Sequence, residues 1–167
     1  MTELLILAIL LNGEFTIYKI KQKIENNFSV FLSASFGSIH PAIKKLEKNG
    51  FISAKRKMSG GGQKSSLYSI TTEGKEHFKN LMTSEIIESP ACSNQLINIK
   101  MMLLDLLDEN LRKIAVESVK KYYEIHLLNT EELLESFKDK DKNLLLISYL
   151  KHYKDKIHRE LRRCIEI

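Results

Sequence analysis

One short stretch, residues 35–50 (SFGSIHPAIKKLEKNG), constrains the fold more than any other part of the chain. Its apolar residues Ile39, Ile43 and Leu46 recur at helical spacing and would share one buried stripe. Gly50 follows, at a point where helices often end on a left-handed residue. Small polar residues occupy the leading end and lysines the flanks. The pattern is typical of an ordinary amphipathic surface helix and also of a helix that enters the major groove of DNA.

Pro41 leaves two starting points open for this helix. Proline removes one backbone hydrogen bond and clashes with the carbonyl four residues earlier, which belongs to Gly37. Either Gly37 eases that strain inside a longer helix, or the helix starts at Ser38 and Pro41 lies in the first turn, where a missing donor costs little. Both alternatives present the first few residues of the helix to a partner.

Two helices are expected before this stretch. Residues 4–11 form a continuous apolar run, far shorter than the roughly 20 residues that cross a bilayer, so we expect a buried helix. Because Glu3 is the only charge before this run, we expect no signal peptide. Thr16 is the expected N-cap of a second helix, with isoleucines on its inner face and lysines outside. The second and third helices would then form a helix-turn-helix.

After the third helix the apolar period changes from helical to strand-like. Residues 51–58 and 66–71 predict two antiparallel strands joined by a glycine-rich loop at 59–64. The loop lacks the spacing of a nucleotide-binding P-loop, and we exclude that function. Its shoulders are uniformly basic, which suits a sugar-phosphate backbone. With a fourth helix capped by Thr72, the plan is that of a winged helix-turn-helix.

The positive charge of the chain is confined to its first half. Residues 1–85 hold 12 Lys and Arg against 7 Asp and Glu, a balance of +5, whereas residues 86–167 hold 14 of each, a balance of zero. The whole net charge of +5 therefore belongs to the segment with the winged pattern. This uneven placement favours a nucleic-acid partner.

No metal-binding or catalytic pattern is evident in the order of residues. Cys92 and Cys164 are expected to be free thiols because nothing indicates export, and the neighbours of Cys92 do not favour a redox role. The five histidines lack metal-binding spacing. Catalytic groups can still be assembled in space, so a small hydrolase or transferase stays open as an alternative. We expect no enzymatic activity, no cofactor and no metal.

The second half of the chain predicts a helical region after a linker at residues 86–94. Helices are expected at 95–107, at about 109–137 and, after the alternating charges of residues 138–142, near the end of the chain. Long helices with broad apolar sides are not stable alone in water. They must therefore pack on one another as a self-contained hairpin or against a second copy of the chain.

Several short segments are characteristic of a known family. In the first half they are the opening apolar run with residues 18–20, then 35–52, 61–62 and 68–74 (YSITTEG); in the second half they are 104–107 (LDLL) and 160–163 (ELRR). Together they resemble the PadR family of bacterial transcriptional regulators, in its longer form with a helical C-terminal dimerisation region. The chain departs from the family where Phe36 and His40 replace common tyrosines and where residues 63–66 are less basic.

The resemblance implies a mainly α fold. It places an N-terminal winged helix-turn-helix DNA-binding domain at residues 1–85, a linker at 86–94 and a C-terminal α-helical dimerisation domain, with a role in effector sensing, at 95–167. The implied function is that of a cytoplasmic, sequence-specific repressor that binds a pseudo-palindromic operator as a homodimer and is released by a small apolar or aromatic effector. A winged-helix module that binds proteins and not DNA is the alternative.

The residues expected to contact double-stranded DNA lie on the second helix, the third helix and the wing. Base edges would be read from the leading end of the third helix, and phosphates held by its lysines, by the second helix and by the wing. In chain order the set is Tyr18, Lys19, Ser35, Phe36, Ser38, His40, Lys44, Lys45, Lys48, Lys55, Arg56, Lys57 and Lys64.

Two further sets are expected in the second half of the chain. Apolar positions of the long helices would form the dimer interface: Leu111, Ile114, Tyr122, Ile147, Leu150, Ile157 and Leu161. A deformable group of methionines and tyrosines would either belong to the core or line an effector pocket: Met101, Met102, Tyr122 and Tyr123.

Overall fold

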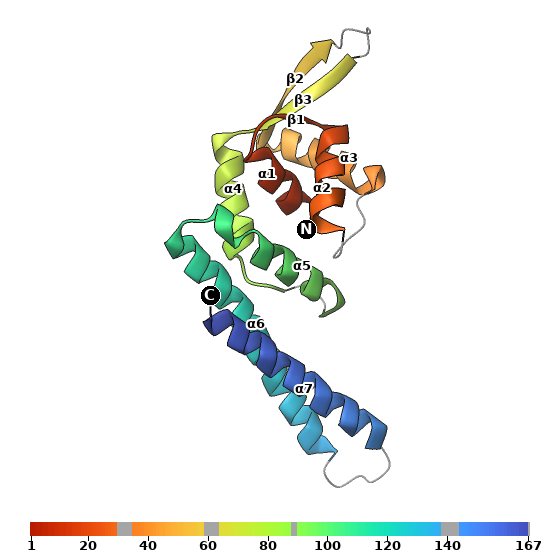
Figure 1. Cartoon of the computed structure of the whole chain (residues 1–167), viewed down its shortest axis with the longest axis vertical. Helices are drawn as coiled ribbons and strands as arrows, with labels where there is room; N and C mark the ends of the chain where they lie inside the picture. The colour runs from red at the N-terminus through yellow and green to blue at the C-terminus, as the bar shows by residue number, and fades with distance from the viewer. Residues whose placement is uncertain (30–34, 59–63, 88–89, 138–143, 167) are drawn as a thin grey trace.

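Helix α1 (Thr2–Leu10) forms the centre of the N-terminal half. Its seven residues from Leu4 to Leu10 are all buried, because helices α2 (Ile17–Phe28), α3 (Phe36–Lys48) and α4 (Thr72–Thr83) surround it (Figure 1). A helix that is apolar on all sides must be covered on all sides. The continuous apolar run in the sequence thus becomes the core on which the winged part is built.

The computed structural model describes residues 1–29, 35–58, 64–87, 90–137 and 144–166, with the backbone alone at 36, 57, 58, 64, 90 and 91. The remaining elements are β1 (Phe15–Thr16), β2 (Ile52–Met58), β3 (Lys64–Ile70), α5 (Pro90–Met102), a short 3-10 helix (Leu104–Leu106), α6 (Glu109–Ser136) and α7 (Leu144–Ile165). In Figure 1 the wing and the α6–α7 pair extend from opposite ends of the α1–α5 body.

The second helix begins at its predicted cap, and the start of the third helix, which the sequence left open, is set by Ser35. The Thr16 side chain accepts a hydrogen bond from the backbone N–H of Lys19 at 3.3 Å, and α2 follows. Ser35 caps α3, which begins at Phe36 and therefore contains Pro41 in its interior, beyond the first turn. The longer-helix alternative holds. The turn between α2 and α3 includes residues 30–34, which lie outside the described part of the chain.

The wing is an antiparallel pair with a third, shorter strand beside it. Strand order is β1-β3-β2, with β2 and β3 paired from Ile52↔Ile70 to Met58↔Lys64. The expected mainly α fold with a two-stranded wing is confirmed. Strand β1, which pairs Phe15 with Tyr68, was not predicted, because two residues are too short to show a strand period.

The cap of α4 is Thr71, so the predicted cap at Thr72 is wrong by one residue. The Thr71 hydroxyl accepts from the backbone N–H of Gly74 at 3.0 Å and donates to the carbonyl of Gly50 at 2.7 Å. Adjacent threonines have equal capping chemistry. The choice is made by the fold, which brings the end of α3 against the end of β3.

Helix α5 starts at Pro90, within the segment that we expected to be a linker, and ends at Met102 rather than at 107. Proline is well suited to the first helical position because its missing N–H would be unsatisfied there in any case. Four apolar residues from α5 and the turn that follows belong to the same core as α1–α4: Ile99, Leu103, Leu104 and Leu107. This core therefore contains residues from both halves of the sequence.

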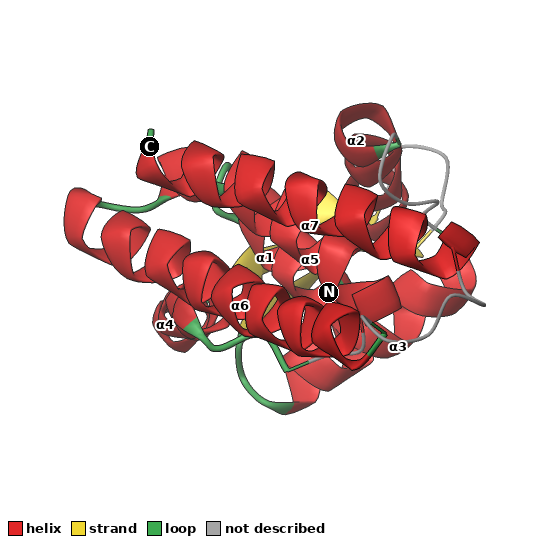
Figure 2. Ribbon diagram, turned by 90° about the horizontal axis from the view of Figure 1, so that it is seen from below, coloured by secondary structure: helices red, strands yellow, loops and turns green. Residues whose placement is uncertain are grey.

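Helices α6 and α7 form a long antiparallel pair with a core of its own. In Figure 2 the two helices run side by side in front of the winged half. Their contact buries Val119, Tyr123, Ile157 and Cys164, and Lys154 pairs with Glu131 across it at 2.6 Å. The expected long helix at about 109–137 is confirmed, and the pair has the geometry of a hairpin.

Burial of the α6–α7 core predicts sensitivity to alkaline pH. Desolvation raises the pKa of Tyr123, of Tyr153 and of Cys164 above their ordinary values. A side chain whose folded pKa is raised contributes stability below its unfolded pKa, and the contribution is lost as pH rises through the folded pKa. We expect the melting temperature to fall from pH 9 to pH 11, less in Tyr123→Phe than in wild type. The exposed Tyr149→Phe should retain the full fall. Equal falls in wild type and Tyr123→Phe would contradict this account.

Candidate nucleic-acid interface

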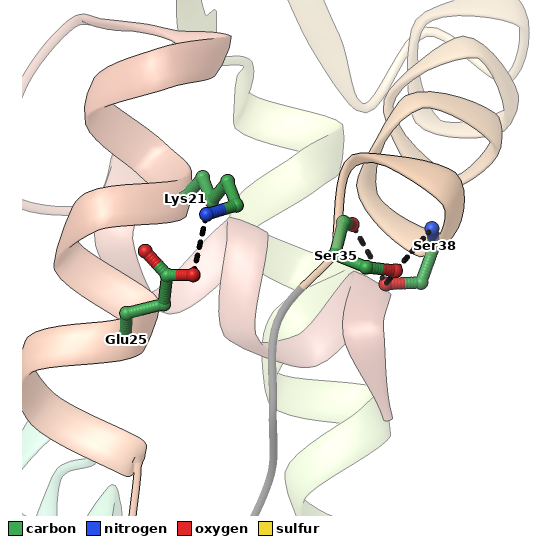
Figure 3. A network of polar contacts seen from close by, with 4 residues as sticks. All are labelled: Lys21, Glu25, Ser35 and Ser38. Atoms are coloured by element: carbon green, nitrogen blue, oxygen red, sulfur yellow. Dashed lines mark hydrogen bonds and ion pairs between the residues drawn. The ribbon is translucent and has the colours of Figure 1, made fainter.

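The leading end of α3 presents two serine hydroxyls to solvent. Figure 3 shows Ser35 and Ser38 at this end, near the Lys21–Glu25 ion pair of α2. Ser35 Oγ accepts from the backbone N–H of Ser38 at 3.3 Å, and Ser38 Oγ donates to the Ser35 carbonyl at 3.0 Å. Because the Ser38 proton is already used, its oxygen can act as an acceptor toward a donor such as a base amino group.

The two faces of α3 divide as the sequence predicted. Ile39, Ile43 and Leu46 are 0–1% exposed, and they hold the helix against the core. His40, Lys44 and Lys48 are exposed on the other faces. No ion pair to Lys44 or Lys48 is present within the described residues. These two ammonium groups are therefore available to an anionic partner.

Lys45 differs from its neighbours because it already has a partner. Its Nζ lies 2.7 Å from Oε1 of Glu3 at the start of α1. Lys44 and Lys45 are consecutive, and a helix turns by about 100° per residue, so the two side chains leave the helix in different directions. The sequence predicted that Lys44 and Lys45 both contact DNA. In the structure the Lys45 side chain lies along the flank of α3 that faces α1.

The second helix and the wing supply the other predicted contacts. Tyr18 is 67% exposed, and Lys19 is exposed with its Nζ 2.7 Å from Gln22. On β2, Arg56 is exposed and Lys55 lies 3.4 Å from Glu14. The side chains of three predicted residues lie outside the described part of the chain: Phe36 at the start of α3, and Lys57 and Lys64 near the end of the wing.

The residues predicted for the dimer interface have different environments. Tyr122, Leu150 and Ile157 are buried, at 1–8% exposure. Leu111, Ile147 and Leu161 are half-buried. Ile114 is 51% exposed and is the member of the set that is most open to a partner. Much of the predicted interface is therefore used within one chain to join α6 to α7.

An exposed apolar stripe on α6 was not predicted. Ile114, Ile125 and Leu128 are 51%, 51% and 56% exposed. Ile125 and Leu128 follow Ile114 by 11 and 14 positions, close to three and four turns of about 3.6 residues, so the three side chains lie on one face of the helix. That periodicity was present in the sequence. It was hidden because the opposite face of α6 is also apolar, and only packing shows which face α7 covers.

Of the residues predicted for an effector pocket, Tyr122 lies at a cavity of about 190 Å³ between α6 and the segment after α4. Met101 is half-buried, Met102 is 46% exposed and Tyr123 belongs to the α6–α7 core. The ring of Tyr122 lies 4.3 Å from that of His126. The cavity is lined by Glu85, Ile86, Ile87, Ser118, Lys121, Tyr122, Ile125 and His126, and Lys121 and Glu85 form an ion pair there.

Membrane-spanning helices and metal-binding clusters are both absent from the described residues. None of the helices there is both long and apolar enough to cross a membrane. The same residues contain no cluster of three or more histidine, cysteine, aspartate or glutamate side chains that could hold a metal ion. The exposed serines, histidine and lysines of α3, with the basic wing, form the candidate site.

Comparison with known proteins matches the winged half of the chain. Residues 6–80 match the family described as "Transcriptional regulator PadR-like family". The "Negative transcriptional regulator PadR" of Bacillus subtilis (strain 168) is 32% identical over 71 residues, which are 42% of this chain and 39% of that relative.

Solved structures with similar folds include two from this family. Bacillus subtilis PadR in complex with operator DNA aligns over 98% of this chain and 94% of its own, at 16% identity and a TM-score of 0.46. A PadR-like transcriptional regulator from Bacillus cereus strain ATCC 14579 aligns over 47% and 74%, at 31% identity and a TM-score of 0.40. Over residues 6–80, its winged half, the chain is similar to the PadR-like family of transcriptional regulators.

Proposed function

We propose that this chain is a sequence-specific, DNA-binding transcriptional repressor that acts as a homodimer on a pseudo-palindromic operator. The observation that carries the proposal is α3 itself, whose buried isoleucine stripe fixes a helix that presents Ser38, His40 and Lys44 to solvent. The match of residues 6–80 to a family of transcriptional regulators supports it, and the curated relative is described as a negative regulator. The protein-binding alternative would show no salt-dependent affinity for DNA.

The proposed roles follow from side-chain chemistry and position. Ser35, Ser38 and His40, at the leading end of α3, would approach base edges and determine sequence preference. Lys44 and Lys48 would neutralise phosphates, while Tyr18 and Lys19 would contact the backbone from α2. On the wing, Lys55, Arg56, Lys57 and Lys64 would hold the flanking minor groove. Phosphate contacts set affinity and its salt dependence, whereas base contacts set specificity.

Lys44→Ala tests the phosphate role. We expect it to weaken binding to all duplex sequences by about tenfold, because a charge-assisted contact is lost. The slope of log affinity against log salt should flatten by about 0.9, the value for one phosphate. Ser38→Ala or His40→Ala should instead change the preference among operator variants. Binding is measured by fluorescence anisotropy at several salt concentrations.

Lys113→Ala is the matched control for Lys44→Ala. This exposed lysine pairs with Glu109 at 2.7 Å on α6 and has no proposed role at DNA. It changes the net charge of the chain by the same amount and should leave affinity and salt slope as in wild type. If Lys44→Ala also behaved as wild type, Lys44 would not belong to the interface.

We propose that α6 and α7 pair with a second copy of the chain, which would fix the separation of two α3 helices. Support comes from Ile114, Ile125 and Leu128, which are exposed on one face of α6, because exposed apolar side chains are stabilised when a partner covers them. Two copies related by a twofold axis match half-sites separated by about one helical turn or a multiple of it. Residues 1–85, 86–94 and 95–167 remain the proposed DNA-binding, linker and dimerisation regions.

We further propose that a small apolar effector binds near Tyr122. The cavity of about 190 Å³ beside Tyr122 has an apolar wall formed by Ile86 and Ile125 and a polar one that includes Lys121. It adjoins the exposed stripe of α6 through Ile125, so a bound molecule would contact the region proposed to pair with a second copy. Titration of the protein with candidate apolar compounds, followed by loss of DNA binding, tests this part.

A further inference from the structure

One acid is placed against the proposed DNA-binding helix from another element. Glu3 lies in the first turn of α1, 42 residues before Lys45, and its Oε1 accepts a hydrogen bond from Lys45 Nζ at 2.7 Å. Ser38 and Pro41 of α3 line the same shallow hollow, together with the first residues of the chain. A phosphate that approached this flank of α3 would therefore meet a carboxylate as well as an ammonium group.

Of the two partners, Glu3 is held in place and Lys45 can move. The Glu3 side chain is 22% exposed, it lies in the first turn of α1 next to the buried residues Leu4 to Leu10, and its second oxygen lies 3.8 Å from Nε2 of His77 on α4. The His77 ring is itself stacked on Phe51, with 4.0 Å between the ring centroids. The Lys45 side chain is 63% exposed on a long flexible stem. If the ion pair breaks, we therefore expect the Lys45 side chain to move and the Glu3 side chain to stay in place.

We propose that Glu3 competes with DNA phosphate for the ammonium group of Lys45. It holds Lys45 against α1 and thereby lowers the affinity of the α3 surface for DNA. The inference rests on the proposed DNA-binding function and adds a regulator of that site. Lys45 must exchange one anionic partner for another when DNA binds, so the net gain from its phosphate contact is reduced.

The ion pair on the wing shows why Glu3 is singled out. Lys55 and Glu14 are 3.4 Å apart, and both side chains are well exposed, at 73% and 41%. Such a pair is screened by water and contributes little. Glu3 combines a shorter distance to its lysine with lower exposure and with a second fixed neighbour, so its hold on the lysine is the stronger of the two.

Glu3→Gln removes the charge and keeps the shape of the side chain. We expect it to bind any duplex more tightly than wild type by about two- to fivefold, the range for a partly exposed pair. The slope of log affinity against log salt should become steeper by up to about 0.9, because Lys45 now counts as a phosphate contact. Thermal unfolding of each variant is measured alongside anisotropy with duplex DNA.

Two further variants distinguish competition for Lys45 from a general effect of the net charge on DNA affinity. In a Lys45→Gln background, Glu3→Gln should lose most of its effect, because the competition needs the lysine. Glu76→Gln is the matched control: Glu76 also pairs with a lysine at 2.7 Å, Lys79 of α4, and neither residue has a proposed role at DNA. It adds the same charge to the same half of the chain and should change affinity little.

The outcomes distinguish this inference from the proposed function. Absence of salt-dependent DNA binding by wild type would overturn the proposed function. Wild-type binding with no gain in a folded Glu3→Gln, or a gain that persists in the Lys45→Gln background, would overturn the competitor role alone. If Glu3→Gln melts early, Glu3→Asp keeps the charge with a shorter reach. It should then give an affinity above that of wild type, and an affinity equal to wild type would overturn the inference.

Discussion

Gly74→Ala is expected to unfold the winged half at temperatures at which the wild-type protein is folded. A Cβ atom at Gly74 would lie 1.9 Å from the carbonyl oxygen of Phe51 and 2.9 Å from Cγ1 of Ile70. The Phe51 carbonyl cannot simply move away, because it accepts the backbone N–H of Thr71 at 3.1 Å. Helix α4 would have to shift away from the wing. We expect a loss of about 3 kcal/mol or more in the free energy of unfolding.

Gly37→Ala is the control for this prediction. A Cβ at Gly37 would make only an ordinary contact, 3.6 Å from Ser35 Oγ. Alanine is favoured over glycine in helices by about 1 kcal/mol, so Gly37→Ala should melt at or slightly above the wild-type temperature. Unfolding of both variants is followed by circular dichroism, on heating for the melting temperature and in urea for the free energy of unfolding. Equal midpoints for Gly74→Ala and Gly37→Ala would show that the approach of α4 to Phe51 is not needed for folding.

The Gly74 contact illustrates what local sequence can and cannot predict. The helices of the winged half were predictable because each carries its own apolar period: the stripe of α3 and the Thr16 cap of α2 depend on residues within a few positions. The close approach of Gly74 to Phe51 depends on how β3 returns beside β2. No pattern of neighbouring residues encodes that distance, and the same holds for the two-residue strand β1.

In the candidate site, too, some features follow from neighbouring residues and others depend on how the elements pack. Exposure of Lys44 and burial of Ile43 follow from the helical period alone. The pairing of Lys45 with Glu3 does not, since it requires α1 and α3 to cross at their ends. In the second half, both faces of α6 are apolar, so the sequence predicted helices that must pack but could not tell which face α7 covers. The structure assigns Tyr122 to the inside and Ile125 to the outside.

Ile125→Glu is expected to dissociate the proposed dimer. Ile125 is 51% exposed at the middle of the stripe that begins at Ile114. In a twofold interface one substitution appears twice, so a carboxylate is buried on each side and the two repel each other where they face. Loss of about 2 kcal/mol on each side would raise the dimer dissociation constant by about 1,000-fold. Sedimentation at micromolar concentration should then show a monomer.

Loss of the dimer should lower the affinity for the operator much more than it lowers the melting temperature of the winged half. A monomer holds one half-site, so affinity for the full operator should fall by about 100-fold, because the second half-site is no longer bound at high effective concentration. Melting of the winged half should change little, since α1–α4 do not depend on the stripe. Leu145→Glu is the matched control, because Leu145 is 89% exposed at the start of α7 and lies off the stripe. If Leu145→Glu gave a monomer while Ile125→Glu remained dimeric, the interface would lie at the far end of the α6–α7 pair, and the spacing between the two α3 helices would be set from there.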